Sequence, residues 1–272
     1  MSAAVKLATH GVSKTFRKGE VEVEVLRDVS IEVGTGQFVS IVGASGCGKT
    51  TFLRVIDGLI RPSSGTITIN GKDVTSPGPD RGFVFQQDGL MPWRTVAANV
   101  MLGLEVQHRT GPAARKLAAE FIRLVGLSGF EKHYPHELSG GMRQRVNLAR
   151  ALSVEPDVLL MDEPFAALDA QTREIMQSEL TRIWQETRKT VIFITHQIDE
   201  AVFLSDRVLV FTARPGRLKE DIAIDLPRPR TLALKRSAEF VQYTDRIWRL
   251  IEEEVRAGID FEAQAAAALH AP

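Results

Sequence analysis

The sequence predicts an α/β fold, in which a largely parallel sheet follows an antiparallel sheet and is interrupted by a helical lobe. The parallel sheet is indicated by short, continuous apolar runs, because strands covered on both faces are apolar without alternation. Helical stretches separate several of these runs, as they do in domains with parallel strands. The runs lie at Phe38–Val42, which only Ser40 interrupts, and at Val158–Met161, Val191–Ile194 and Val208–Phe211.

The residues before the first of these runs show a different pattern. Valine alternates with glutamate from Val21 to Val25, which predicts a half-buried strand with its three valines on one face. Similar short strands are predicted at Val5–Ala8 and Val29–Val33. Together they predict an antiparallel sheet at the N-terminal edge of the fold.

Strand patterns disappear between Thr95 and Glu155, where the sequence predicts three helices. We therefore expect a helical lobe, about 95–155, inserted in a domain that covers 1–230. Pro227 and Pro229 then interrupt the chain, and residues 231–272 are expected to form a helical extension. The lobe helices are predicted at Thr95–Val106, Ala113–Val125 and Gly140–Leu152, and the apolar positions of the extension are Phe240, Thr244, Ile247, Trp248, Ile251 and Val255.

The composition is typical of a globular protein that is not stabilised by disulfide bonds. Its 34 basic and 34 acidic residues cancel, so a global positive field for binding nucleic acid is not expected. Cys47 is the single cysteine and has no internal disulfide partner. No apolar run approaches the roughly 18–20 residues that span a bilayer, and we recognise no signal-peptide pattern.

A glycine-rich segment between a predicted strand and a predicted helix fits G-x-x-x-x-G-K-[ST] at every position. Its glycines let backbone N–H groups point at phosphate oxygens, and the helix presents its positive end to the same anion. Lys49 is placed to reach the β- and γ-phosphates, and Thr50 to set its hydroxyl on Mg²⁺. A tight turn with a chance lysine is the disfavoured alternative. The predicted nucleotide contacts are Gly43, Ala44, Ser45, Gly46, Cys47, Gly48, Lys49, Thr50 and Thr51.

A second motif lies at the end of the apolar strand that begins at Val158, where two carboxylates follow one another. Parallel strands deliver such residues to the carboxyl edge of the sheet, beside the phosphate loop. Asp162 is the candidate to hold Mg²⁺, and Glu163 the candidate to polarise the attacking water.

A third motif, Leu138-Ser-Gly-Gly-Met-Arg-Gln-Arg145, opens a predicted helix. The hydroxyl of Ser139, the exposed N–H groups of Gly140 and Gly141 and the positive helix end together predict a second anion site. This site is far in sequence from the first.

Together these motifs resemble the nucleotide-binding subunit of ABC (ATP-binding cassette) transporters, from about residue 5 to residue 230. The resemblance implies a P-loop NTPase ABC-type core with an N-terminal antiparallel β-sheet and an inserted α-helical subdomain. It also implies an ATPase whose cofactors are ATP and Mg²⁺. By the same resemblance, Phe16 stacks on adenine, Gln86 senses Mg²⁺ and the γ-phosphate, Asp169 belongs to the dimer-contact loop, and His196 contacts the γ-phosphate. Catalysis would then rest on Glu163, His196 and Gln86, and the metal site on Thr50, Gln86 and Asp162.

In that family two subunits stack head to tail, with ATP between Lys49 of one subunit and Ser139 of the other. The implied partners are a second copy of the chain, transmembrane permease subunits and, through the permease, an extracytoplasmic solute-binding protein. The implied location is the cytoplasmic face of the inner (plasma) membrane, as a peripheral protein. Segment Asp88–Arg94 either docks the permease or, through Trp93, contributes to the core of the lobe.

Three further segments resemble the nitrate, sulfonate and taurine importers within that family. They lie at Pro77–Gly82, Leu90–Trp93 and Ala213–Arg217. The alternatives are a non-transport ABC ATPase that acts on ribosomes or DNA, a nucleotide-binding module without turnover, and an exporter. A GTPase is disfavoured because no Asn-Lys-x-Asp segment occurs.

Overall fold

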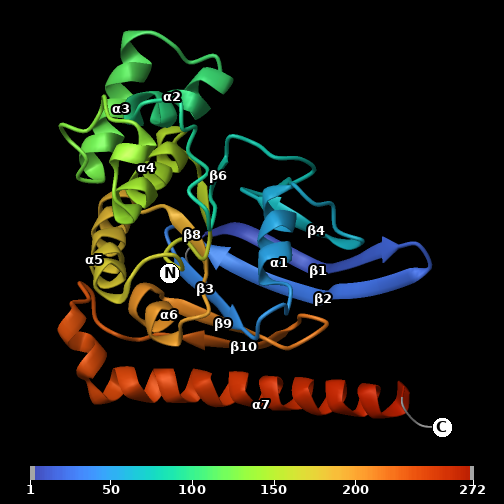
Figure 1. Ribbon diagram of the computed structural model, residues 1–272. Helices are drawn as coiled ribbons and strands as arrows, with labels where there is room; N and C mark the ends of the chain where they lie inside the picture. The colour runs from blue at the N-terminus through green and yellow to red at the C-terminus, as the bar shows by residue number, and fades with distance from the viewer. Residues whose placement is uncertain (1–3, 270–272) are drawn as a thin grey trace.

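The computed structural model describes residues 4–269, which form two sheets surrounded by helices (Figure 1). One sheet is antiparallel, with strand order β2-β1-β4-β5. The other has the order β10-β9-β3-β8-β7-β6 and is parallel except at the β9–β10 edge. The strands are β1 (Val5–Lys18), β2 (Val21–Gly34), β3 (Phe38–Gly43), β4 (Ser64–Ile69), β5 (Lys72–Asp73), β6 (Arg81–Val84), β7 (Val158–Asp162), β8 (Thr190–Ile194), β9 (Arg207–Phe211) and β10 (Leu218–Ala223). The predicted fold class is confirmed.

Helices α2, α3 and α4 follow β6 and precede β7, and they gather in a separate group at one end of the molecule (Figure 1). Thr95 caps α2 by accepting a hydrogen bond from the N–H of Ala98, which explains why the helix begins there. The helices are α1 (Lys49–Asp57), α2 (Val96–Val106), α3 (Pro112–Leu124), α4 (Gly140–Ser153), α5 (Ala170–Thr187), α6 (Ile198–Leu204) and α7 (Ala238–Leu269), with short 3-10 turns η1 (Pro135–Glu137) and η2 (Leu232–Arg236).

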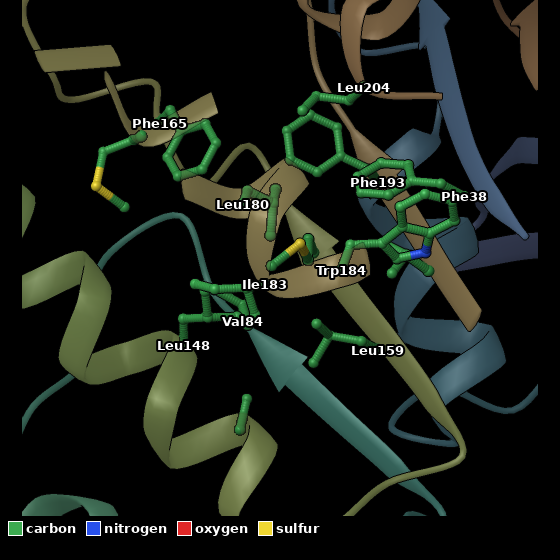
Figure 2. Packing of buried hydrophobic residues seen from close by; sticks show 14 of the residues in the cluster. Phe38, Val84, Leu148, Leu159, Phe165, Leu180, Ile183, Trp184, Phe193 and Leu204 are labelled. Atoms are coloured by element: carbon green, nitrogen blue, oxygen red, sulfur yellow. The ribbon is translucent and has the colours of Figure 1, made fainter. Parts of the chain in front are cut away.

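The six-stranded sheet separates two apolar cores. One core lies between the sheet, α1 and the antiparallel sheet. The other joins the opposite face of the sheet to α5, α6 and the lobe helices. Figure 2 shows part of the second core, where Trp184 of α5 lies edge-on to Phe38 of β3 with ring centroids 6.0 Å apart. The sheet is thus covered on both faces, which is why its strands are apolar throughout.

One prediction about the antiparallel sheet is wrong. The residues from 21 to 34 form one strand, β2, and its first valines are not half-buried: Val21 is 62% exposed and Val23 47% exposed. They lie at the projecting end of the β1–β2 hairpin (Figure 1). Alternation there marks a strand in solvent and not a strand on the core.

Helix α7 follows the predicted amphipathic pattern only in part. Phe240 and Ile247 are buried against the body, whereas Trp248 is 56% exposed and Val255 41% exposed. The helix runs along the β10 edge of the molecule and also contacts α6 (Figure 1). Within residues 4–269, no helix combines the length and the apolar character needed to cross a membrane.

Candidate functional site

The glycine-rich segment forms a tight loop between β3 and α1. Gly48 caps α1 with φ 100°, a left-handed conformation that favours glycine. A Cβ at Gly48 would also lie 2.9 Å from the carbonyl oxygen of Val25, closer than side chains pack. The loop therefore requires glycine at position 48, where the loop ends and α1 begins.

Lys49 lies inside this loop with only 6% of its surface exposed. Its Nζ donates to the carbonyl oxygens of Gly43, at 2.9 Å, and Ala44, at 3.0 Å. Cys47 is buried beside it, and burial raises the pKa of its thiol, so Cys47 packs as a small residue. The loop thus concentrates backbone donors, the helix N-terminus and one ammonium group at a single place, which suits phosphate oxygens.

Thr50 and Asp162 meet at the edge of this loop. The Thr50 hydroxyl donates to Oδ1 of Asp162 at 3.0 Å, and Asp162 is the last residue of β7. Burial raises the pKa of Asp162, and the Thr50 hydrogen bond opposes that shift. A hydroxyl and a carboxylate side by side are hard oxygen ligands, which fit Mg²⁺. The third predicted ligand, Gln86, is exposed just beyond β6, and its backbone oxygen accepts from Gln144.

Glu163 and His196 are the second pair that the sheet brings together. Glu163 Oε2 lies 3.2 Å from Nδ1 of His196, which follows β8. Glu163 has a left-handed φ of 46°, and its N–H donates to the carbonyl oxygen of Ile194 at 3.0 Å. The turn after β7 is therefore fastened to the adjacent strand, and a carboxylate and an imidazole face the same edge as the loop.

The segment at Ser139 lies on the lobe, with hydrogen bonds inside its own helix. Ser139 caps α4 by accepting from the N–H of Met142, and Gly141 packs against Thr172 of α5. Asp169 caps α5, and the backbone N–H of Thr172 lowers the pKa of this exposed carboxyl. Ser139, Gly140 and Gly141 thus form a second group at the start of α4, in contact with α5, whose first turn Asp169 caps.

Phe16 lies on β1 and is 40% exposed, with Nζ of Lys14 5.0 Å from its ring centroid. The partly exposed ring fits the expected stacking on a base, with the ammonium group of Lys14 over one of its faces. Phe16 pairs with Val23 in the β1–β2 hairpin and belongs to the antiparallel sheet, whereas β7 and β8 belong to the other sheet.

Segment Asp88–Arg94 leaves Trp93 72% exposed, so Trp93 is not part of the lobe core. The segment is held from α4: Arg143 Nε donates to Asp88 at 3.0 Å, and Arg150 donates to the carbonyl oxygens of Gly89 and Asp88 at 2.8 and 2.7 Å. The exposed indole therefore lies on a segment tied to the helix that Ser139 opens.

Sequence reasoning missed two sets of contacts. Glu200, 3% exposed, accepts hydrogen bonds from Thr195 and from Gln177, and so supports the turn that carries His196. Arg214 donates from Nε to the carbonyl oxygen of Gly46 at 3.1 Å. The Ala213–Arg217 pattern was visible in the sequence, but no local signal connects it to a loop 168 residues away.

Comparison with known proteins supports the resemblance to ABC transporters that the sequence motifs indicate. The family model described as ABC transporter matches residues 26–166. The chain is 52% identical over 251 residues to an uncharacterized ABC transporter ATP-binding protein of Methanocaldococcus jannaschii, covering 92% of this chain and 93% of that protein. It is 48% identical to an aliphatic sulfonates import ATP-binding protein of Bacillus licheniformis (80% and 84% covered) and 47% identical to a nitrate import ATP-binding protein of a Synechocystis strain (88% and 92% covered).

Among solved structures, the chain resembles a dimeric ATP-binding cassette in a post-hydrolysis state bound to ADP and Pi. The TM-score is 0.70 at 33% identity, and the match covers 81% of this chain and all of that one. The family match at residues 26–166 includes the loop around Lys49 and the carboxylates Asp162 and Glu163. This chain belongs to the ABC transporter family, as an ATP-binding subunit that hydrolyses ATP.

Proposed function

We propose that two copies of this chain pair head to tail and close on ATP, with each nucleotide between Lys49 of one copy and Ser139 of the other. The dimeric cassette to which the chain is similar supports this pairing. So does the position of the two groups on different helices, α1 and α4, because each group alone would contact only one side of a nucleotide. ATP would then stabilise the closed dimer, and hydrolysis would weaken it.

The observation that carries the proposal is the meeting of two residue pairs at one sheet edge, beside the Lys49 loop. Lys49 would bind the β- and γ-phosphates. Glu163, 3.2 Å from His196, would orient and polarise the attacking water, and His196 would contact the γ-phosphate. Phe16 would stack on the adenine.

Thr50 and Asp162 would hold Mg²⁺, with Gln86 reaching the same ion from the end of β6. Bound there, Mg²⁺ would neutralise charge on the β- and γ-phosphates. The hydrogen bond between Thr50 and Asp162 keeps both oxygen donors at one place. Asp169, at the start of α5, would belong to the contact between the two copies.

We further propose that the chain powers the uptake of a small anion, a sulfonate such as taurine or nitrate. Two relatives, an aliphatic sulfonates import protein and a nitrate import protein, support this class of solute. The chain would act at the cytoplasmic face of the inner membrane as a peripheral subunit. Its exposed Trp93 would dock a permease that receives solute from an extracytoplasmic binding protein. Action on ribosomes or DNA has no such support here.

The ATPase assignment is tested with Glu163→Gln. This variant should bind ATP, form a stable dimer in gel filtration and release phosphate at least about a hundredfold more slowly than wild type. Lys49→Ala is the matched control, because it should lose both binding and dimerisation. Rapid steady-state phosphate release by Glu163→Gln would remove Glu163 from its role.

The transport assignment is tested with the same variant as bait. Tagged Glu163→Gln with ATP should recover a multi-span membrane protein and a solute-binding protein from native membranes. Titration of that binding protein with taurine, alkanesulfonates and nitrate would then identify the anion. Recovery of ribosomes or DNA-associated proteins instead would refute transport and leave the ATPase.

A further inference from the structure

The turn between β9 and β10, residues 212–217, lies directly against the phosphate loop. The N–H of Gly216 donates to the carbonyl oxygen of Val25 at 2.9 Å, and the N–H of Arg27 donates to the carbonyl oxygen of Gly216 at 3.0 Å. A Cβ at Gly216 would come within 2.1 Å of the carbonyl oxygen of Cys47, so the backbones of turn and loop are in contact. The turn is therefore fastened to β2 on one side and to the loop on the other.

Arg214 extends from this turn along the outer face of the loop. Its Nε donates to the carbonyl oxygen of Gly46 at 3.1 Å, and its Nη2 lies 2.6 Å from the place of a Cβ at Gly46. The N–H of Cys47, which belongs to the same peptide group as that carbonyl, donates to the oxygen of Ala44 at 3.3 Å. Both ends of this peptide are thus held, and its plane fixes where the neighbouring N–H groups of the loop point.

Helix α7 supports the turn from behind. Glu254 accepts a hydrogen bond from the N–H of Ala213 at 2.9 Å and pairs with Lys219 of β10 at 2.9 Å. Lys219 also donates to the carbonyl oxygen of Leu250, on α7, at 3.0 Å. A continuous set of contacts therefore runs from α7 through Ala213 and Arg214 to Gly46. In Figure 1, α7 passes along the β9–β10 side of the sheet, where these contacts lie.

We propose that Arg214 is a positioning residue for the nucleotide and that α7, through Glu254, sets how firmly Arg214 holds the phosphate loop. The proposal rests on the assignment of residues 43–50 as the loop that binds phosphate. Arg214 acts through the backbone of Gly46. It therefore sets affinity for the phosphates, whereas the rate of the chemical step depends on groups across the loop, Glu163 and His196.

The test compares Arg214→Ala with Arg217→Ala. Arg217 is an exposed arginine of the same turn whose guanidinium makes no hydrogen bond to the described residues. Loss of one solvent-exposed hydrogen bond predicts a Kd for ATP and a KM about fivefold higher in Arg214→Ala, with kcat within about twofold of wild type. Arg214→Lys, which keeps a cationic donor, should recover part of the affinity, and Arg217→Ala should match wild type.

The contribution of α7 is tested by a double-mutant cycle. Glu254→Ala should raise the Kd in the same direction, and Arg214→Ala combined with Glu254→Ala should be no weaker than Arg214→Ala alone. Unchanged affinity in Arg214→Ala, an equal loss in Arg217→Ala, or a fall in kcat with constant KM would overturn the proposal. If the effects of Arg214→Ala and Glu254→Ala on the Kd for ATP add fully in the double variant, the role of α7 is overturned.

Lys49→Ala separates this inference from the assignment on which it rests. If wild type binds ATP, Lys49→Ala does not, and Arg214→Ala binds like wild type, only the role of Arg214 fails. If Lys49→Ala binds ATP as wild type does, residues 43–50 are not the phosphate loop and both assignments fail.

Discussion

Replacing Arg230 tests how much its buried hydrogen bonds stabilise the C-terminal part of the domain. Its side chain is 5% exposed, and it makes no ion pair with the residues that the structure describes. Its guanidinium instead donates to five backbone carbonyl oxygens around the end of α6 and the segment after β10. These are Val202 at 2.9 Å, Phe203 at 3.1 Å, Ser205 at 2.7 Å, Ile224 at 3.2 Å and Leu226 at 3.3 Å.

The magnitude follows from those contacts. Burial lowers the pKa of Arg230 to about 10, with a further contribution from Arg228, so the group stays charged at neutral pH. At about 1 kcal/mol for each hydrogen bond, Arg230→Ala should lower the free energy of unfolding by about 4–5 kcal/mol. For a chain of 272 residues that corresponds to a fall in Tm of roughly 7–9 °C.

The assay is urea unfolding followed by far-UV circular dichroism, with Arg230→Met beside Arg230→Ala. Met fills much of the same volume but donates no hydrogen bond, so both variants should lose most of the stability. Desolvation of a buried cation can cancel the gain from its contacts. An Arg230→Met variant within about 1 kcal/mol of wild type would show that cancellation and refute the reasoning.

Burial raises the pKa of Asp57 from 3.8 to about 6 in spite of Arg81 nearby. The folded state therefore holds that proton more tightly than the unfolded state. In urea unfolding, the free energy of unfolding relative to Asp57→Asn should fall measurably, with about 3 kcal/mol as its upper limit, as pH rises from 4 to above 6. Parallel pH curves for the two proteins would contradict this. Trp93→Ala should keep ATPase activity in solution but recover less permease from native membranes, since Trp93 is 72% exposed; equal recovery would exclude Trp93 from docking. Glu200→Ala should lower kcat about tenfold in steady-state ATPase assays with little change in KM, because it removes the acceptor of Thr195 beside His196; a rise in KM alone would count against it.

The predictable parts of this fold are those that local sequence determines. The loop at Lys49 could be located because its glycines, lysine and threonine are contiguous and lie between a strand and a helix. The cap at Ser139 was likewise a local pattern, and the structure has its hydroxyl accepting from Met142. Such elements require no knowledge of which strands are neighbours.

Other features depend on tertiary placement and were not predictable. The alternation at Val21 and Val23 is the same for a strand on the core and for the end of a projecting hairpin, and only the position of the hairpin distinguishes them. Trp248 lies at an apolar helical position, yet it is 56% exposed because the body covers α7 mainly at Phe240 and Ile247. Periodicity gives the face of a helix but not how much of that face is covered.

The order of strands in the parallel sheet explains why the site lies where it does and why Arg214 is next to it. In the order β9-β3-β8-β7, the loop after β3 is flanked on one side by the ends of β8 and β7, which carry His196 and Glu163. On the other side it is flanked by the end of β9, whose following turn carries Arg214. All four strands are parallel, so their carboxyl ends share one edge. This strand order gathers the catalytic groups on one side of the phosphate loop. For the same reason it places Arg214, which contacts the backbone of the loop, on the other side.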